Sequence, residues 1–142
     1  MGFDYRYLEE GNDVDSLVEA LEALRGIDHP VVLHHLPLSA KAKTAAIPVG
    51  TVMKRVDVMG DDDESDTVVG AAWEPLLSTD AATVLPVAVV DTPCDPTGEN
   101  GESSALCVVH GGVKNRVLTT GDGKALTDVR IAQLSEHGIY AV

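Results

Sequence analysis

Three histidines are the side chains of this sequence best suited to bind a metal ion. His34 and His35 are adjacent, and His110 follows a valine-rich run further along the chain. Imidazole is the commonest metal ligand in proteins, so one reading of the sequence is a small metal-dependent hydrolase. Adjacent residues of a strand point to opposite faces, however, which separates His34 from His35. No carboxylate lies at a recognisable ligand spacing, and we therefore expect no metal site.

The two cysteines, Cys94 and Cys107, offer no better case for catalysis. Cys107 and His110 are three residues apart on an expected strand, so they point to opposite faces. The sequence also lacks a CxxC pair, a GxSxG elbow and the GxxxxGK[ST] phosphate loop, although TTGDGK resembles the last superficially. We therefore predict that the chain is not an enzyme and needs no cofactor. Both thiols are expected to be free and partly buried, with a disulfide as the less favoured alternative.

The charge of the chain limits its partners. Twenty-three acidic residues against ten basic ones give a net charge of −13. Such a surface repels phosphate, so we expect no nucleic-acid partner. Scarce lysine and abundant aspartate suit a halophilic source, and an ordinary acidic protein is the equal alternative. No apolar run approaches the roughly 20 residues that cross a bilayer and no secretory signal is recognisable, so we expect no membrane partner and an intracellular origin.

The densest acidic run, residues 60–66, connects two apolar segments. Five of the six residues from Asp61 to Asp66 carry carboxylates. A calcium loop would need alternating ligands and a central glycine, which this run lacks. We therefore interpret it as a solvated turn.

Hydrophobic periodicity predicts one early helix and one late helix around a set of strands. Residues 13–25 place apolar side chains three and four apart, and Gly26 follows as a stop. Apolar or alternating runs at 31–36, 46–58, 67–77, 82–91 and 104–113 predict strands, and residues 115–120 are expected to continue extended. Thr127 can cap a second, short helix that ends before Gly138. This order predicts an α+β, mainly β domain whose antiparallel sheet closes into a small barrel or roll.

The segment from residue 105 to the end has a distinctive order of strand, small-residue turn, second strand, glycine turn, short helix and terminal Gly-Ile. It resembles the C-terminal part of the head decoration (capsid cement) proteins of tailed viruses, the lambda-type family. The ending Leu134-Ser135-Glu136-His137-Gly138-Ile139 is similar to that family's Leu-x-x-x-Gly-Ile. Upstream, Gly50-Thr51-Val52-Met53, Trp73-Glu74-Pro75-Leu76 and the strand from Leu85 to Asp91 follow the family's order. The resemblance covers roughly residues 45–142.

The resemblance implies a β-tulip-like fold and a structural role. Residues 1–44 would form an N-terminal arm that includes the helix, and residues 45–142 a β-rich decoration domain. Such proteins bind the outside of an icosahedral capsid as homotrimers at three-fold positions, with the major capsid protein as partner, after synthesis in the host cytoplasm. The apolar tail could contact the trimer partner or the capsid, or simply close the core. The candidate contacts are Phe3, Tyr5, Tyr7, Ile139, Tyr140 and Val142. A β-barrel adaptor in another assembly, such as a tail or a secretion apparatus, is the remaining alternative.

Overall fold

The computed structural model describes residues 31–61 and 67–142. The predicted helix at 13–25 and the first part of the arm lie outside these residues, as does most of the acidic run. In the part that is described, no helix is long and apolar enough to cross a membrane.

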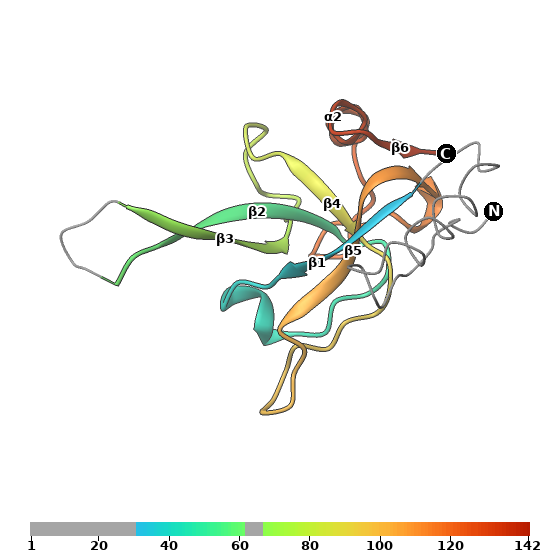
Figure 1. Cartoon of the computed structure of the whole chain (residues 1–142). Helices are drawn as coiled ribbons and strands as arrows, with labels where there is room; N and C mark the ends of the chain where they lie inside the picture. Colours follow the sequence, from blue (N-terminus) through green and yellow to red (C-terminus); the bar gives the residue numbers. More distant parts are fainter. Residues whose placement is uncertain (1–30, 62–66) are drawn as a thin grey trace, which may run out of the picture.

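The described chain is mainly β-structure, as the sequence predicts, with one α-helix and two short 3-10 turns (Figure 1). Valine-rich runs form most strands because β-branched side chains pack well on a pleated surface. The 3-10 turn η2 replaces the extended chain expected after residue 114. In chain order the elements are β1 (Val32–Pro37), η1 (Lys41–Thr44), β2 (Val52–Met59), β3 (Val68–Pro75), β4 (Pro86–Val90), β5 (Ser104–Val113), η2 (Asn115–Val117), α2 (Asp128–Glu136) and β6 (Ile139–Ala141).

The strands form one sheet in the order β1-β5-β4-β2-β3. Every neighbouring pair along this path is antiparallel, and β6 adds to β5 as a parallel strand. Pro86 is the first residue of β4, where its missing N–H costs least. β4 is short and pairs with β2 only through Val52, Met53 and Lys54.

The closed barrel expected from the sequence is wrong, because the sheet is open. In the described chain its edge strands, β1 and β3, share no ladder. The one β-bridge between these edges joins Leu38, just after β1, to Trp73, and the Ser39 N–H donates to the Trp73 carbonyl at 3.0 Å. One such bridge cannot close the sheet, and the outer halves of β2 and β3 extend away from the other strands (Figure 1). The antiparallel, mainly β character is confirmed.

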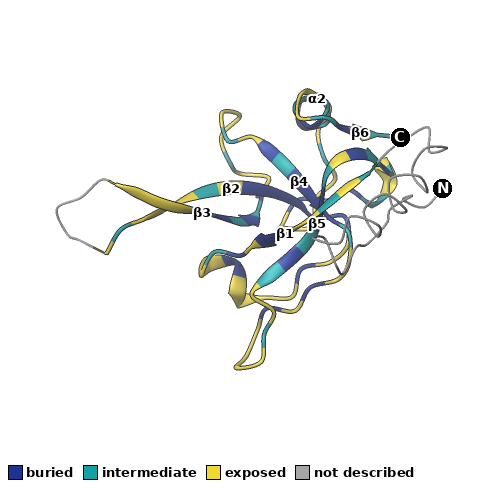
Figure 2. Ribbon diagram, viewed as in Figure 1, coloured by how far each residue is buried: buried dark blue, intermediate teal, exposed yellow. Residues whose placement is uncertain are grey.

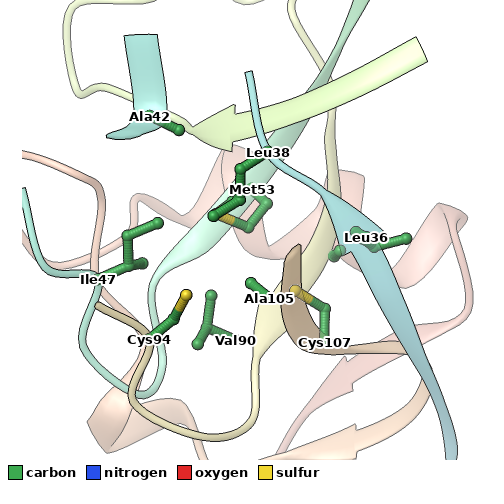
Figure 3. Packing of buried hydrophobic residues seen from close by; sticks show 10 residues of the cluster. Leu36, Leu38, Ala42, Ile47, Met53, Val90, Cys94, Ala105 and Cys107 are labelled. Carbon is green, nitrogen blue, oxygen red and sulfur yellow. The ribbon is translucent and has the colours of Figure 1, made fainter. Parts of the chain in front are cut away.

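Apolar side chains bury both faces of the central sheet. Neighbours such as Val52 and Met53 point to opposite faces and enter different hydrophobic clusters. Figure 2 shows the buried strand segments at the crossing of β2, β4 and β5. The first core cluster, shown in Figure 3, contains Leu36, Leu38, Ala42, Ile47, Met53, Ala88, Val90, Cys94, Ala105 and Cys107. The second core cluster contains Val52, Leu76, Val89, Val108, Val113, Leu118, Leu134 and Ile139.

The late helix is confirmed close to its predicted limits. The Thr127 side chain accepts a hydrogen bond from the Arg130 N–H at the start of α2, as an N-cap residue should. Gly138 stands just beyond the end with a φ of 82°. Leu134 is fully buried, so α2 covers the second core cluster with its inner face.

Candidate protein-binding surface

The outer halves of β2 and β3 form a two-stranded ribbon, defined here as residues 55–59 and 68–72. Pairing with β4 ends at Lys54, while pairing with β3 continues as far as Met59. Within the described chain no third strand pairs with either strand of the ribbon. Figure 1 shows the ribbon projecting well beyond the rest of the sheet.

The outer part of this ribbon consists mostly of exposed residues (Figure 2), and several of them are large and apolar. The exposed fractions are 41% for Val58, 47% for Met59, 49% for Val68 and 64% for Val69. Val58 and Met59 are successive strand residues and point to opposite faces, so both faces carry apolar surface. Val69 is the extra residue where the register shifts between Val58 and Met59. An isolated two-stranded hairpin is only marginally stable in water, so contact with another protein surface would stabilise the ribbon.

A buried charge cluster lies where the ribbon leaves the sheet. Lys54 Nζ is 2.7 Å from Asp80 Oδ2 and 3.4 Å from Glu74 Oε1. Lys54 and Glu74 are only 7% and 8% exposed. The Ser39 hydroxyl donates to Glu74 Oε2 at 2.8 Å, and the Leu77 N–H donates to Asp80 Oδ2 at 2.8 Å. These bonds connect β2 and β3 to two loops at the base of the ribbon.

The pKa of Asp80 follows from the same contacts. Partial burial raises this pKa, but the hydrogen bonds from Lys54 and from the Leu77 N–H outweigh it, aided by the charges of Lys54 and Arg130. The net result is a pKa below the ordinary value. Arg130 also donates to the carbonyls of Asp80 and Ala81, at 3.0 and 3.1 Å, and so connects this loop to α2.

A cavity of about 270 Å³ opens beside this cluster, lined in part by Ile47, Thr51 and Thr120. The Lys54 ammonium in its wall is already paired with two carboxylates. Lys54 is therefore engaged within the protein, whereas Lys41, which also lines the cavity, is exposed.

The three histidines do not converge on one site. His34 and His35 are exposed neighbours on β1, opposite Cys107 and Leu106. His110 lies opposite Val32, and its ring meets Tyr140 edge to face at a centroid distance of 6.4 Å. Among residues 31–61 and 67–142, no three His, Cys, Asp or Glu side chains are grouped so that they could hold a metal ion.

Both cysteines are free and buried, which confirms the expected free thiols. Burial, together with a hydrogen bond and the negative charge of Glu102, raises the pKa of Cys94 to about 12. Burial is also the main cause that raises the pKa of Cys107 to about 12. Thiols with such pKa values stay protonated near neutral pH, and the thiol form is a poor nucleophile.

The predicted contact residues of the C-terminal tail separate into two groups. Ile139 is 0% exposed and belongs to the second core cluster, so core closure is the correct interpretation for this residue. Tyr140 and Val142 are 50% and 70% exposed and remain available for contact. Phe3, Tyr5 and Tyr7 lie outside the described residues.

The ribbon is the surface that the sequence did not identify. Its strands were predicted, but the acidic run between them indicated only a solvated turn. One signal does exist: the run at 67–77 is long, whereas Pro86 shortens the strand that should lie beside 46–58. A strand pair longer than its neighbour must project beyond it.

No protein-family model, no curated protein and no solved structure matches this chain.

Proposed function

We propose that this chain is a structural virion protein that binds the outside of an icosahedral capsid and stabilises the expanded shell, as a homotrimer at three-fold positions. The observation that carries the proposal is the projecting ribbon with apolar side chains on both faces. Such a surface suits contact with protein, since exposed apolar patches mark interaction sites. The major capsid protein is the proposed partner.

The segments that resemble head decoration proteins also support this proposal by their positions in the fold. Gly50-Thr51-Val52-Met53 leads into β2, and β4 lies within the segment from Leu85 to Asp91. The Leu134–Ile139 ending carries the chain from α2 into β6. The similar segments therefore belong to one continuous β-rich unit, as a decoration domain requires.

The mechanism is binding without chemistry. A ligand that binds only one state of an equilibrium stabilises that state by mass action. A trimer that spans several subunits of an expanded shell buries surface that the unexpanded shell does not offer. Each bound copy stabilises the shell modestly, and many copies add these contributions. The net charge of −13 favours a solvent-exposed position on the outside of the shell, away from packaged DNA.

The test is to mix the purified protein with expanded, undecorated capsids. We expect saturable binding of the protein, and we expect decorated shells to disassemble at a higher temperature than undecorated ones. The variant Met59→Ser/Val69→Ser should bind about tenfold more weakly, because it removes exposed apolar contacts. The matched control is Leu85→Ser, which changes a residue that is 42% exposed outside the ribbon. Absence of saturable binding by the unaltered protein would refute the capsid-binding role.

The metal-dependent hydrolase remains an alternative without a supporting observation, since His34, His35 and His110 are not gathered with a further ligand in the described chain. A β-rich adaptor in another assembly would use the same ribbon. The capsid-binding experiment separates the adaptor from the decoration protein.

A further inference from the structure

The cavity of about 270 Å³ at the base of the ribbon concentrates buried polar side chains. Four of the five buried polar or charged residues in the described chain line it: Thr51, Lys54, Glu74 and Thr120. Each of the four is more than nine-tenths buried. Burial of polar groups costs free energy, so their concentration around one cavity is typical of a site for a small ligand.

The remaining wall of the cavity is largely apolar. Ala42 and Ile47 belong both to this wall and to the first core cluster, so this part of the wall is continuous with the core (Figure 3). Pro75 and Leu77, at and just beyond the end of β3, are half-buried and also line the cavity. A ligand that fits both kinds of wall needs an apolar body as well as a polar group.

Backbone hydrogen bonds hold the walls of the cavity in place. The Thr119 N–H donates to the Gly50 carbonyl at 3.0 Å, which fixes the turn after η2. The Ile47 N–H donates to the Cys94 carbonyl at 2.7 Å, which fixes the segment after η1. A cavity that exists before the ligand arrives lowers the entropic cost of binding.

One cation at the cavity is in excess. Lys54 Nζ lies 3.4 Å from a Glu74 oxygen and 2.7 Å from an Asp80 oxygen. The charge of Arg130 also acts on Asp80, so this cluster contains two cations and two carboxylates. Lys41 lines the cavity too, is exposed, and forms no ion pair with another described residue. Its ammonium therefore favours an anionic ligand.

The carboxylates around the cavity are engaged within the protein. One oxygen of Glu74 faces Lys54, and the other accepts a hydrogen bond from the Ser39 hydroxyl at 2.8 Å. Asp122, beside the lining residues of the same turn, accepts from the Ser78 N–H at 2.8 Å and from the Ser78 hydroxyl. These carboxylates therefore offer little to a cationic ligand.

We propose that this cavity binds a small organic carboxylate, whose charged group contacts the Lys41 ammonium and whose short apolar chain packs against Ile47 and Leu77. The cavity lies just below the range of about 300–1,000 Å³ that is usual for ligand pockets, which limits the ligand to a small molecule. The site is separate from the apolar residues of the ribbon, and it goes beyond the capsid-binding role proposed above.

Titration of the isotope-labelled, full-length protein with hexanoate tests the site by nuclear magnetic resonance. The buffer should contain about 0.15 M salt, which screens remote carboxylates beyond about 8 Å. We expect saturable shifts confined to amides of the lining residues, with a Kd on the order of 1 mM. Absence of saturable binding, or shifts spread evenly over the chain, would overturn the proposal.

Related probes separate the charged group from the apolar chain. Hexylamine and hexanol should bind at least about threefold more weakly than hexanoate, because neither can pair with the Lys41 ammonium. Acetate should bind about tenfold or more weakly, since it lacks the apolar chain. Equal binding of hexylamine would overturn the anionic specificity. Equal binding of acetate would show only an anion attracted to a surface lysine, and would overturn the cavity as the site.

Two lysines of η1 provide a matched pair of variants. Lys41→Met should weaken hexanoate binding roughly threefold, whereas Lys43→Met should leave it unchanged, because Lys43 is exposed on the same turn but does not line the cavity. Both residues are exposed, so neither variant should disturb the fold. Equal weakening by the two variants would reveal an effect of net charge and contradict the role of Lys41.

Contacts between the ligand and side-chain methyl groups give an independent measurement. Nuclear Overhauser effects should connect the hexanoate chain to the methyl groups of Ile47 and Leu77. Contacts to the exposed Leu85 or Val142 instead would overturn the proposed site. These experiments use no capsids, so their failure would leave the proposed function intact, and failure of capsid binding would leave the ligand site intact.

Discussion

The inner and outer halves of β2 and β3 differ sharply although the same strands run through both. At the inner end of β2, Val52 and Met53 are 0% exposed, as is Leu76 just after β3, whereas Val58 and Met59 at the outer end are 41% and 47% exposed. The difference follows from β4, which pairs with β2 only as far as Lys54. Apolar side chains therefore build a core where a third strand is present and an accessible surface where it is absent.

The inner and outer halves of β2 also differ in the burial of their charged side chains. Lys54 lies in a buried cluster with Glu74 and Asp80, while its neighbour Arg55 pairs with Asp57 at the surface, 3.0 Å apart and about half exposed. Buried pairs depend strongly on every partner, because a lone buried charge is costly, whereas exposed pairs contribute little. Stability should therefore reside in the inner half and binding in the outer half.

The largest expected effect is the loss of the buried cation. Lys54→Met leaves the carboxylates of Glu74 and Asp80 without their partner and should lower the free energy of unfolding by about 3–5 kcal/mol. Arg55→Met is the matched control on the next residue and should cost at most about 1 kcal/mol. Urea denaturation at neutral pH measures both. Similar losses in the two variants would contradict the contrast between buried and exposed charge.

A pair of methionines on β2 tests the contrast for apolar side chains. Met53→Ala opens a cavity in the first core cluster and should cost about 2–5 kcal/mol. Met59→Ala removes an exposed side chain and should change stability by less than about 0.5 kcal/mol. Thermal or urea unfolding of dilute protein gives both values. A large loss for Met59→Ala in a monomeric sample would show that the ribbon is packed within its own chain.

A close backbone contact just before β2 gives a third test. Gly50 has a φ of 84°, and a Cβ there would lie 1.9 Å from the Val117 carbonyl oxygen. Gly50→Ala should therefore cost about 2–4 kcal/mol, through backbone strain and a forced shift of the neighbouring turn. Gly123→Ala has a similar φ, 77°, with nothing within 4 Å, so it should cost only about 1–2 kcal/mol. Equal costs would mean that the turn containing Val117 moves freely.

The smallest effect concerns pH. The pKa of Asp80 is lowered in the folded protein from an ordinary value of 3.8, so its carboxylate stabilises the fold above that pH. This contribution is lost as the pH falls through the folded pKa. Asp80→Asn should lower the free energy of unfolding by about 1–3 kcal/mol at neutral pH, with the difference from the unaltered protein shrinking in acid. Unfolding measured from neutral to acidic pH would contradict this if the difference stayed constant.

Much of the fold follows from local patterns. The valine runs predicted the strands, and Thr127 and Gly138 marked the limits of α2. The run at 82–91 predicted a longer strand than β4, which begins only at Pro86. The turn at 115–117 was missed because its three residues, Asn, Arg and Val, carry no strong turn signal. Ile139 could not be assigned as core or contact from sequence, since an apolar residue at a chain end is compatible with both.

The sequence by itself determined the mainly β character, the short C-terminal helix and the acidic charge, because each depends on residue type or on neighbours along the chain. Tertiary structure alone decided that the sheet stays open, that Lys54 is buried, and that one half of β2 and β3 projects as a ribbon. The physical reason is that each of these depends on which distant strand lies alongside. The same valine or methionine is core beside β4 and exposed beyond it.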